Sequence, residues 1–234
     1  MSHESIDIEA RDATVIIIPA YNEAESIAAV VDGLTPNFPR VLVVDDGSTD
    51  ATADRARRAG APVLRHVLNR GQGAALQTGI TAALRDGARY LVTFDADGQH
   101  QPADIPALLA PIIAGQCDVV LGSRFLGRAP GMTTSRRAVL RAGVLFTRLF
   151  SRIAVTDTHN GLRAFSRRAA EQLEITMDRM AHASEVIDQI ARLRLRWCEA
   201  PVTIRYTDYS RAKGQSSRRA FRVALHYLLR RMMP

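Results

Sequence analysis

The sequence has few of the features that mark secreted, membrane-spanning or nucleic-acid-binding proteins. Only two cysteines occur in 234 residues, Cys117 and Cys198, and both lie in apolar contexts that predict buried thiols in a reducing compartment. No apolar run approaches the roughly 18–20 residues that cross a bilayer, and residues 1–13 are too polar for a secretory signal. Aromatic residues make up 6% of the chain, which argues against a nucleic-acid partner. These absences predict a cytoplasmic protein.

Lysine is almost missing as well. Lys213 is the only one, so arginine supplies nearly all of the 31 basic side chains. Against 24 acidic residues the net charge is +7, and the pI near 10.2 favours acidic partners such as nucleotides and lipid headgroups. With 47% hydrophobic residues, the chain can bury a sizeable core.

Short β-branched runs alternate with helical patterns through the first half of the chain. Strands are predicted over 14–18, 41–44, 62–67, 90–94 and 118–122, with helices near 24–34, 50–59, 72–86 and 103–114. This alternation predicts an α/β fold with a mostly parallel central sheet covered by helices on both faces. Ser48 and Asp50 are expected to cap the second helix, which ends at Gly60.

The pattern changes after residue 122. The prediction there is a loop over 122–135, a helix over 136–152, the strand-like NGLRAF, a helix near 182–195, the strand WCEAPVTIRY, a loop over 207–216 and a terminal helix. We expect one domain over 1–234, with a nucleotide-binding half (1–122) and an acceptor-side half (123–234).

Polar sequences follow four of the predicted strands, namely PAYNEAE, DDGSTD, DADGQH and GSRFLG. Because ligands of open parallel sheets bind beyond the carboxyl ends of the strands, these sequences should converge on one crevice. Tyr21 offers a ring that can stack on a base, and Asp46 can accept hydrogen bonds from a base or ribose. A strand-to-helix turn and a helix cap are the simpler interpretations of the first two sequences.

DADGQH carries the strongest signal. In an extended segment Asp95, Asp97 and Gln99 point to the same side. Two carboxylates that close repel each other unless a cation lies between them, and oxygen ligands suit Mg²⁺ or Mn²⁺. His100 competes with Gln99 as the third ligand. The alternative is a solvated turn, but the position level with the other strand ends favours a metal site.

Other features point to anions and membranes. NRGQGAALQTG begins a helix whose backbone N–H groups, near Gly73, favour an anion or a close-packed ligand. Arg211 and Lys213 lie in a basic loop that could close over a diphosphate, unless it is only a solvated surface loop. The helix over 136–152 and the terminal helix each have a basic and an apolar face, suited to an anionic membrane interface or to packing on the core.

Together the motifs resemble the family 2 glycosyltransferases with the GT-A fold, and among them the dolichyl-phosphate mannosyltransferases and polyprenyl-phosphate glycosyltransferases. The matching sequences are PAYNEAESI, VVDDGSTD, NRGQGAALQTG, FDADGQH, GSRF, HNGLRAFSR, EAPVTIRY and SRAKGQS, which span residues 15 to about 217. One departure is HNGLR, where His159 and Asn160 replace the smaller residues that are more usual.

The resemblance implies three groups of site residues. A nucleotide sugar would contact Pro19, Tyr21, Asn22, Glu23, Asp46, Gly73 and Asp95. A divalent metal, Mg²⁺ or Mn²⁺, would be held by Asp95, Asp97 and Gln99. Phosphates of donor or acceptor would meet Arg124, Arg136, Arg137, Arg211 and Lys213. The implied acceptor is a polyprenyl phosphate at the inner face of the cytoplasmic membrane, where a separate membrane-anchor protein is a possible partner.

The expected reaction is an inverting transfer of a hexose from a GDP-mannose or UDP-glucose type donor, with Asp97, Arg124 and Glu185 as catalytic residues. A phosphate monoester is largely dianionic at pH 7 and can attack without a base. A hydroxyl acceptor would need one, and Glu185 is the first candidate before Asp157 and Asp188. The alternatives are a nucleotidyltransferase, which would carry a glycine-rich basic signature where PAYNEAE stands, a phosphohydrolase, and a non-catalytic nucleotide-binding protein.

Overall fold

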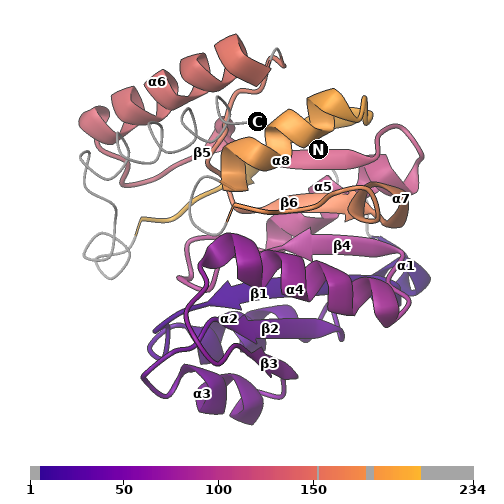
Figure 1. The fold of residues 1–234 in the computed structure, drawn as a ribbon, viewed down its shortest axis with the longest axis vertical. Helices are drawn as coiled ribbons and strands as arrows, with labels where there is room; N and C mark the ends of the chain where they lie inside the picture. Colours follow the sequence, from indigo (N-terminus) through magenta and orange to yellow (C-terminus); the bar gives the residue numbers. More distant parts are fainter. Residues whose placement is uncertain (1–5, 152, 178–181, 207–234) are drawn as a thin grey trace.

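A seven-stranded sheet forms the centre of the protein. The computed structural model describes residues 6–151, 153–177 and 182–206 (Figure 1). The strands are β1 (Thr14–Ala20), β2 (Val41–Asp45), β3 (Val63–Arg65), β4 (Tyr90–Thr93), β5 (Val119–Arg128), β6 (Arg163–Ser166) and β7 (Trp197–Thr203). They lie in the order β3-β2-β1-β4-β6-β5-β7, and only β6 runs antiparallel to its neighbours. The predicted α/β fold with a mostly parallel sheet is confirmed.

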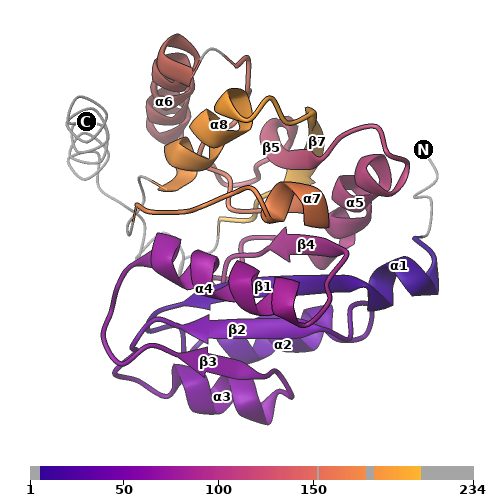
Figure 2. The same ribbon diagram turned by 45° about the vertical axis from the view of Figure 1, so that its right-hand side comes forward.

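Helices cover both faces of the sheet (Figure 2). They are α1 (Ile8–Asp12), α2 (Ile27–Leu34), α3 (Thr52–Arg58), α4 (Gln72–Arg85), the 3-10 turn η1 (Pro102–Asp104), α5 (Ile105–Ile113), α6 (Thr134–Ser151), α7 (Arg167–Ala170) and α8 (His182–Arg192). Ile16 and Ile18 of β1 pack in a core with α2, α3 and α5, whereas Val15 and Ile17 pack with α4, α7 and α8. Alternate side chains of a strand point to opposite faces, so a nearly continuous apolar strand supplies both cores.

Strand β5 is longer than predicted. The glycine-containing sequence after Gly122 indicated a loop, but β5 continues to Arg128, which pairs with Thr203 of β7. A side chain at Gly127 would overlap the main chain of Val202, so glycine is what permits this close approach. The expectation of a loop from residue 122 is therefore wrong up to Arg128.

Smaller differences concern helix starts. The Ser48 hydroxyl does not cap α3 but accepts a hydrogen bond from the Asn22 N–H at 2.9 Å, whereas Asp50 accepts one from the Thr52 N–H at 3.0 Å. The short helices α1 and α7 were not predicted. The predicted loop over 207–216 and the terminal helix lie outside the described residues.

A membrane-spanning helix is not found in the described ranges, where no helix is both long and apolar enough.

Candidate active site

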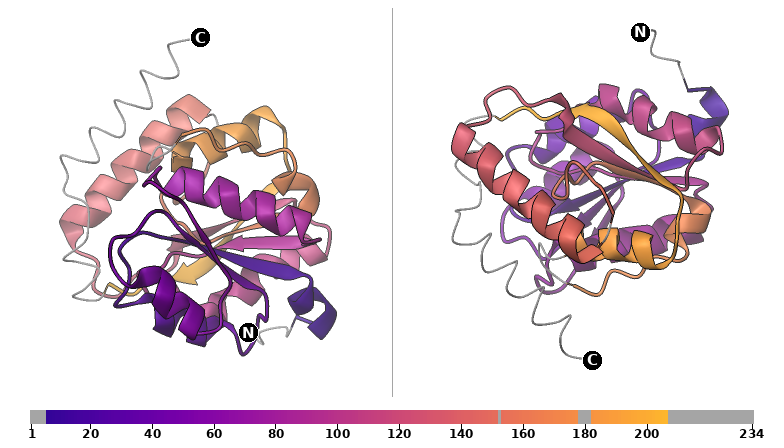
Figure 3. Two further views of the ribbon diagram at one scale, coloured as in Figure 1. Left: turned by 60° about the horizontal axis from the view of Figure 1, so that its bottom comes forward. Right: turned by 90° about the horizontal axis from the view of Figure 1, so that it is seen from above.

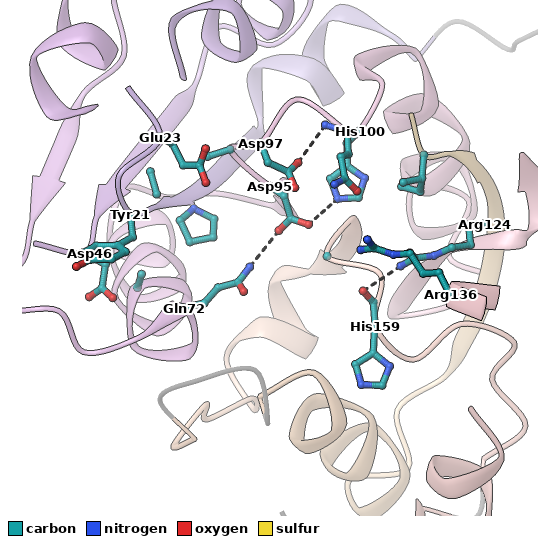
Figure 4. A pocket seen from close by; sticks show the side chains of 17 residues that line it. Tyr21, Glu23, Asp46, Gln72, Asp95, Asp97, His100, Arg124, Arg136 and His159 are labelled. Atoms are coloured by element: carbon teal, nitrogen blue, oxygen red, sulfur yellow. Dashed lines mark hydrogen bonds and ion pairs between the residues drawn. The ribbon is translucent and has the colours of Figure 1, made fainter. Parts of the chain in front are cut away.

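A cavity of about 310 Å³ lies beyond the carboxyl ends of the central strands (Figure 4). Strand pairing places these ends together, because Ala20 of β1 pairs with Asp45 of β2 and Ile17 pairs with Thr93 of β4. The predicted site residues that line the cavity are Pro19, Tyr21, Glu23, Asp46, Asp95, Asp97, Gln99, Arg124 and Arg136. The expected convergence of strand ends is therefore present in the fold.

The charges in this cavity are separated. In Figure 4 the carboxylates lie on the side of β1, β2 and β4, and the two arginines lie across from them. We call Glu23, Asp46, Asp95 and Asp97 the carboxylate wall, and Arg124 and Arg136 the arginine wall. A ligand that fills the cavity meets anionic groups at one end and cationic groups at the other.

Asp95 is held from two sides. The Gln72 amide donates to its Oδ1 at 3.1 Å, and His100 Nε2 donates to its Oδ2 at 2.9 Å. Burial opposes ionisation of this carboxyl, but His100 outweighs it together with His182 and Arg163, so the pKa of Asp95 is lowered. Asp95 is therefore an oriented and ionised carboxylate.

Asp97 has the opposite environment. Its Oδ1 accepts a hydrogen bond from the Gln99 N–H at 3.0 Å. Burial, and then the charge of Asp95, raise the pKa of Asp97 to about 6. A half-buried carboxyl whose ionisation is opposed by a neighbouring ionised carboxylate forms, with that neighbour, a site that a cation would stabilise.

These oxygen ligands fit a hard divalent cation. Within the described ranges, no group of three or more His, Cys, Asp or Glu side chains is arranged to enclose a metal. Mg²⁺ characteristically binds one or two protein carboxylates and completes its coordination with water and substrate phosphates. Asp95 and Asp97, with Gln99 also lining the cavity, agree with that chemistry.

The Asp46 carboxylate holds the loop between β3 and α4 through hydrogen bonds. Its carboxylate accepts hydrogen bonds from His66 Nδ1 at 2.8 Å, the Arg70 N–H at 2.9 Å and the Gly71 N–H at 2.6 Å. His66 Nε2 lies 2.9 Å from the Thr78 hydroxyl of α4. Asp46 thus fixes the connection between β3 and α4 at the side of the cavity.

Asn22 joins the first two strand-end loops and does not appear among the described residues that line the cavity. Its side-chain oxygen accepts a hydrogen bond from the Thr49 N–H at 2.9 Å. Its φ of 55° lies in the left-handed region, which asparagine tolerates better than most residues. The fold explains this residue as a connector between loops.

Two glycines are required by close approach of the chain. A side chain at Gly73 would overlap the Met177 carbonyl, and one at Gly161 would overlap the Asp95 carboxylate. The structure therefore explains Gly73 by packing of α4 against residue 177. Gly161, which belongs to the HNGLR sequence, lets the segment before β6 approach Asp95.

Arg124 is nearly buried and has three partners. Its Nε donates to Asp157 Oδ2 at 2.6 Å, its Nη1 to the Tyr206 hydroxyl at 2.8 Å, and its Nη2 to the His159 carbonyl at 3.0 Å. Burial would lower its pKa, but Asp157 and Tyr206 reverse this, so the pKa of Arg124 is raised. This cation is permanently charged and rigidly held.

The structure separates the two arginines at the start of α6. The Arg136 guanidinium lies 4.7 Å from the centre of the Tyr206 ring and lines the cavity. Arg137 is exposed to solvent. Arg211 and Lys213 lie outside the described residues.

The three candidate bases are placed elsewhere. Glu185 accepts hydrogen bonds from the N–H groups of Thr176 (3.0 Å) and Met177 (2.9 Å), and it is not among the described residues that line the cavity. Asp157 is paired with Arg124, and Asp188 is not among those lining residues either. The structure does not bring Glu185 to the carboxylate wall.

Sequence reasoning missed Gln72, Arg163 and Tyr206 as site residues. Arg163 is fully buried behind Asp95 and donates to the carbonyls of Asn160 and Thr158, both at 3.0 Å, and burial lowers its pKa to about 10. The sequence did offer a signal for Arg163, because an arginine within the apolar, strand-like NGLRAF indicates a buried charge that needs partners. Gln72 and Tyr206 gave no such signal.

The mostly parallel sheet, with acidic residues gathered beyond its strand ends, has the arrangement expected of the GT-A class of sugar transferases. The sequence model of Glycosyl transferase family 2 matches residues 15–174, and the chain belongs to that family. It is a glycosyltransferase.

Named relatives agree with this assignment. The undecaprenyl-phosphate mannosyltransferase of Micrococcus luteus is 37% identical over 199 residues, 80% of this chain and 81% of the relative. The UDP-N-acetylglucosamine–dolichyl-phosphate N-acetylglucosaminyltransferase of Methanococcus voltae is 33% identical over 240 residues, 93% and 95% of the two chains. Among solved structures, glucosyl-3-phosphoglycerate synthase of Mycobacterium tuberculosis, in complex with Mn²⁺, UDP-glucose and phosphoglyceric acid, shares the fold. Its TM-score is 0.70 at 22% identity, over 94% of this chain and 81% of that one.

Proposed function

We propose that the protein is a metal-dependent, inverting hexosyltransferase that uses a nucleotide-diphosphate sugar as donor and a polyprenyl phosphate as acceptor. The observation that carries this proposal is the separation of charge across one cavity. A carboxylate wall suits a cation bound to a diphosphate, and an arginine wall opposite it suits a second phosphate. The relatives named for undecaprenyl-phosphate and dolichyl-phosphate acceptors support this choice of acceptor.

The donor would lie along the carboxylate wall. Tyr21, which is 45% exposed at the edge of the cavity, offers its ring to the base. Asp95, Asp97 and Gln99 would hold Mg²⁺ or Mn²⁺, which when bound supplies positive charge to the leaving diphosphate. Pro19 and Glu23 line the space between these groups. Asn22, Asp46 and Gly73 would act by shaping the loops around the donor.

The acceptor phosphate would meet the arginine wall. Arg124 and Arg136 can attract a dianionic phosphate and orient its oxygen toward the donor. A phosphate acceptor of this kind needs no general base, because it is already largely deprotonated at pH 7. The engagement of Glu185 and Asp157 in other contacts supports an acceptor that attacks unaided. Arg137, which is exposed, remains a proposed phosphate contact, as do Arg211 and Lys213, which lie outside the described residues.

The outer face of α6 suits the surface of an anionic membrane. This helix runs along the outside of the C-terminal half, away from α2 and α3 (Figure 3). Arg137, Arg141 and Leu145, which are spaced four residues apart, are exposed on the same side of it. Basic and apolar side chains on one exposed face favour binding at a lipid interface. We propose peripheral attachment at the inner face of the cytoplasmic membrane, with or without a separate anchor protein.

A donor panel followed by a transfer assay tests the proposal. GDP-, UDP- and dTDP-sugars are added with Mn²⁺, and one base should raise the thermal midpoint while the others do not. That donor is then incubated with geranyl phosphate and with geraniol, whose hydroxyl replaces the phosphate. Transfer of the sugar to geranyl phosphate alone is expected. Transfer to geraniol at an equal rate would contradict the acceptor assignment, and a panel without any shift would contradict the donor assignment.

A further inference from the structure

Tyr206 contacts both arginines of the arginine wall. It follows β7, and its side chain is only 8% exposed. The hydroxyl lies 2.8 Å from Arg124 Nη1, and the ring lies 4.7 Å from the Arg136 guanidinium carbon. One buried side chain thus links two cations that come from β5 and α6.

The hydrogen bonds of Arg124 leave part of its guanidinium for a ligand. Arginine carries five side-chain N–H groups. Within the described residues, three of them donate to Asp157, Tyr206 and the His159 carbonyl. The Tyr206 hydroxyl, which accepts from Arg124, can donate onward to Met132 Sδ at 3.8 Å. Counting contacts with described residues alone, two N–H groups of Arg124 remain, one on each terminal nitrogen, and this residue lines the cavity.

Arg136 is held by stacking on the Tyr206 ring, not by a hydrogen bond to it. A guanidinium that lies over an aromatic ring is attracted through its face, and its N–H groups stay available at the edge. The ring of Tyr206 therefore limits where the Arg136 cation can lie without using its hydrogen-bond donors. Arg136 lines the same cavity as Arg124.

The backbone beside Tyr206 is tied to the carboxylate wall. The Arg205 N–H donates to the Gln99 carbonyl at 2.9 Å, and Gln99 in turn donates its own N–H to Asp97. The segment that carries Tyr206 is thus fixed relative to the loop with the metal-binding carboxylates.

We propose that Tyr206 is a positioning residue that sets the spacing and orientation of Arg124 and Arg136 as one phosphate-binding pair. The ligand class is a phosphate or diphosphate oxyanion bound by both guanidinium groups at once. The inference rests on the proposed function for the identity of the acceptor, but the anion-binding pair itself can be tested without any sugar transfer.

The experiment compares Tyr206→Phe and Tyr206→Leu with the wild-type full chain. Tyr90→Phe and Tyr90→Leu are matched controls, because the Tyr90 ring also lies near an arginine, Arg89 at 5.6 Å, at the start of β4. Calorimetry measures binding of inorganic pyrophosphate and of geranyl phosphate in the presence of EDTA, without nucleotide. Thermal midpoints and the affinity of the preferred nucleotide diphosphate with Mn²⁺ are measured in parallel.

Loss of the hydroxyl should weaken binding of both phosphate probes about fivefold, the scale of one hydrogen bond. Loss of the ring as well should weaken it about thirtyfold, since stacking adds to that effect. In the transfer assay, KM for geranyl phosphate should rise much more than kcat falls. Nucleotide affinity should stay within about twofold, and the Tyr90 variants should match the wild type.

A merely structural role gives a different pattern. Unchanged pyrophosphate affinity in the Tyr206 variants would overturn the inference, as would a parallel loss of pyrophosphate and nucleotide binding that follows the thermal midpoint. If Tyr206→Leu does not fold, the Tyr206→Phe result decides. If the wild type binds no phosphate probe, the inference fails. Wild-type binding of pyrophosphate without transfer to geranyl phosphate would instead reject the proposed function and leave the Tyr206 comparison valid.

Discussion

The two walls of the cavity are built in different ways. The carboxylate wall stands on the ends of adjacent parallel strands, and Asp95 and Asp97 each have one contact from a residue close in the sequence, His100 and Gln99 respectively. The arginine wall depends on partners far along the chain, since Arg124 bonds to Asp157 and Tyr206. Among the described residues, the first wall places two neighbouring carboxylates without a paired arginine, and the second holds an arginine in an ion pair with Asp157.

Because of this difference, we expect the carboxylate wall to matter mainly for ligand binding and the arginine wall mainly for the stability of the fold. Asp95 and Asp97 are half-buried and the charge of Asp95 opposes ionisation of Asp97, so the protein itself gains little from keeping both charges. Arg124 and Asp157 form a buried ion pair, in which removal of one partner leaves the other charge uncompensated. Substitutions on the two walls should therefore affect different measurements.

The largest effect is expected when the arginine wall is broken. Arg124→Met should lower the free energy of unfolding by about 3–5 kcal/mol, because Asp157 stays buried without its cation. Urea denaturation measures this loss. Adding Asp157→Asn should recover a large part of it, whereas Arg137→Met on the exposed side of α6 should change stability by less than about 0.5 kcal/mol. If Arg124→Met lowered the free energy of unfolding only slightly, the arginine wall would not differ from the carboxylate wall in its importance for stability.

A substitution on the carboxylate wall should change binding instead. Asp97→Asn should weaken Mn²⁺-dependent nucleotide binding at least about a hundredfold, because it removes a charge that faces the cation in a water-poor site. In the metal-free protein the free energy of unfolding should be unchanged or higher, since the repulsion by Asp95 is gone. Calorimetry and urea denaturation check the two parts, with exposed Asp54→Asn as the charge-matched control. Unaltered nucleotide affinity would reject the metal assignment.

The close approach of Gly161 to Asp95 offers the smallest and most local test. Gly161→Ala should lower the free energy of unfolding by about 1–3 kcal/mol, because the added methyl group overlaps the Asp95 carboxylate. It should also weaken Mn²⁺-dependent nucleotide binding. Gly33→Ala in α2 is the control, since its methyl group has room and should stabilise the helix by up to about 1 kcal/mol. Equal behaviour of the two variants in thermal unfolding would contradict the close approach at Gly161.

Local patterns were sufficient for much of the carboxylate wall. β-branched runs and their polar ends located β1, β2 and β4, and the rule that ligands bind at strand ends then brought Tyr21, Asp95 and Asp97 to one cavity. The same reasoning failed for β5, where small residues indicated a loop. The sequence also left the orientation of Glu185 open, because a carboxylate on a helix carries no mark of the direction in which it points; in the structure it accepts hydrogen bonds from the N–H groups of Thr176 and Met177.

By itself, the sequence determined the α/β class, the family and the acidic edge of the sheet, because hydrophobic periodicity and short motifs act over a few neighbouring residues. Only the tertiary structure decided that Arg136 lines the cavity whereas Arg137 does not, why Gly73 and Gly161 must be glycine, and that Tyr206 links Arg124 to Arg136. Those outcomes depend on contacts between residues tens of positions apart, and such contacts exist only once the sheet has aligned its strands and the helices have packed on it.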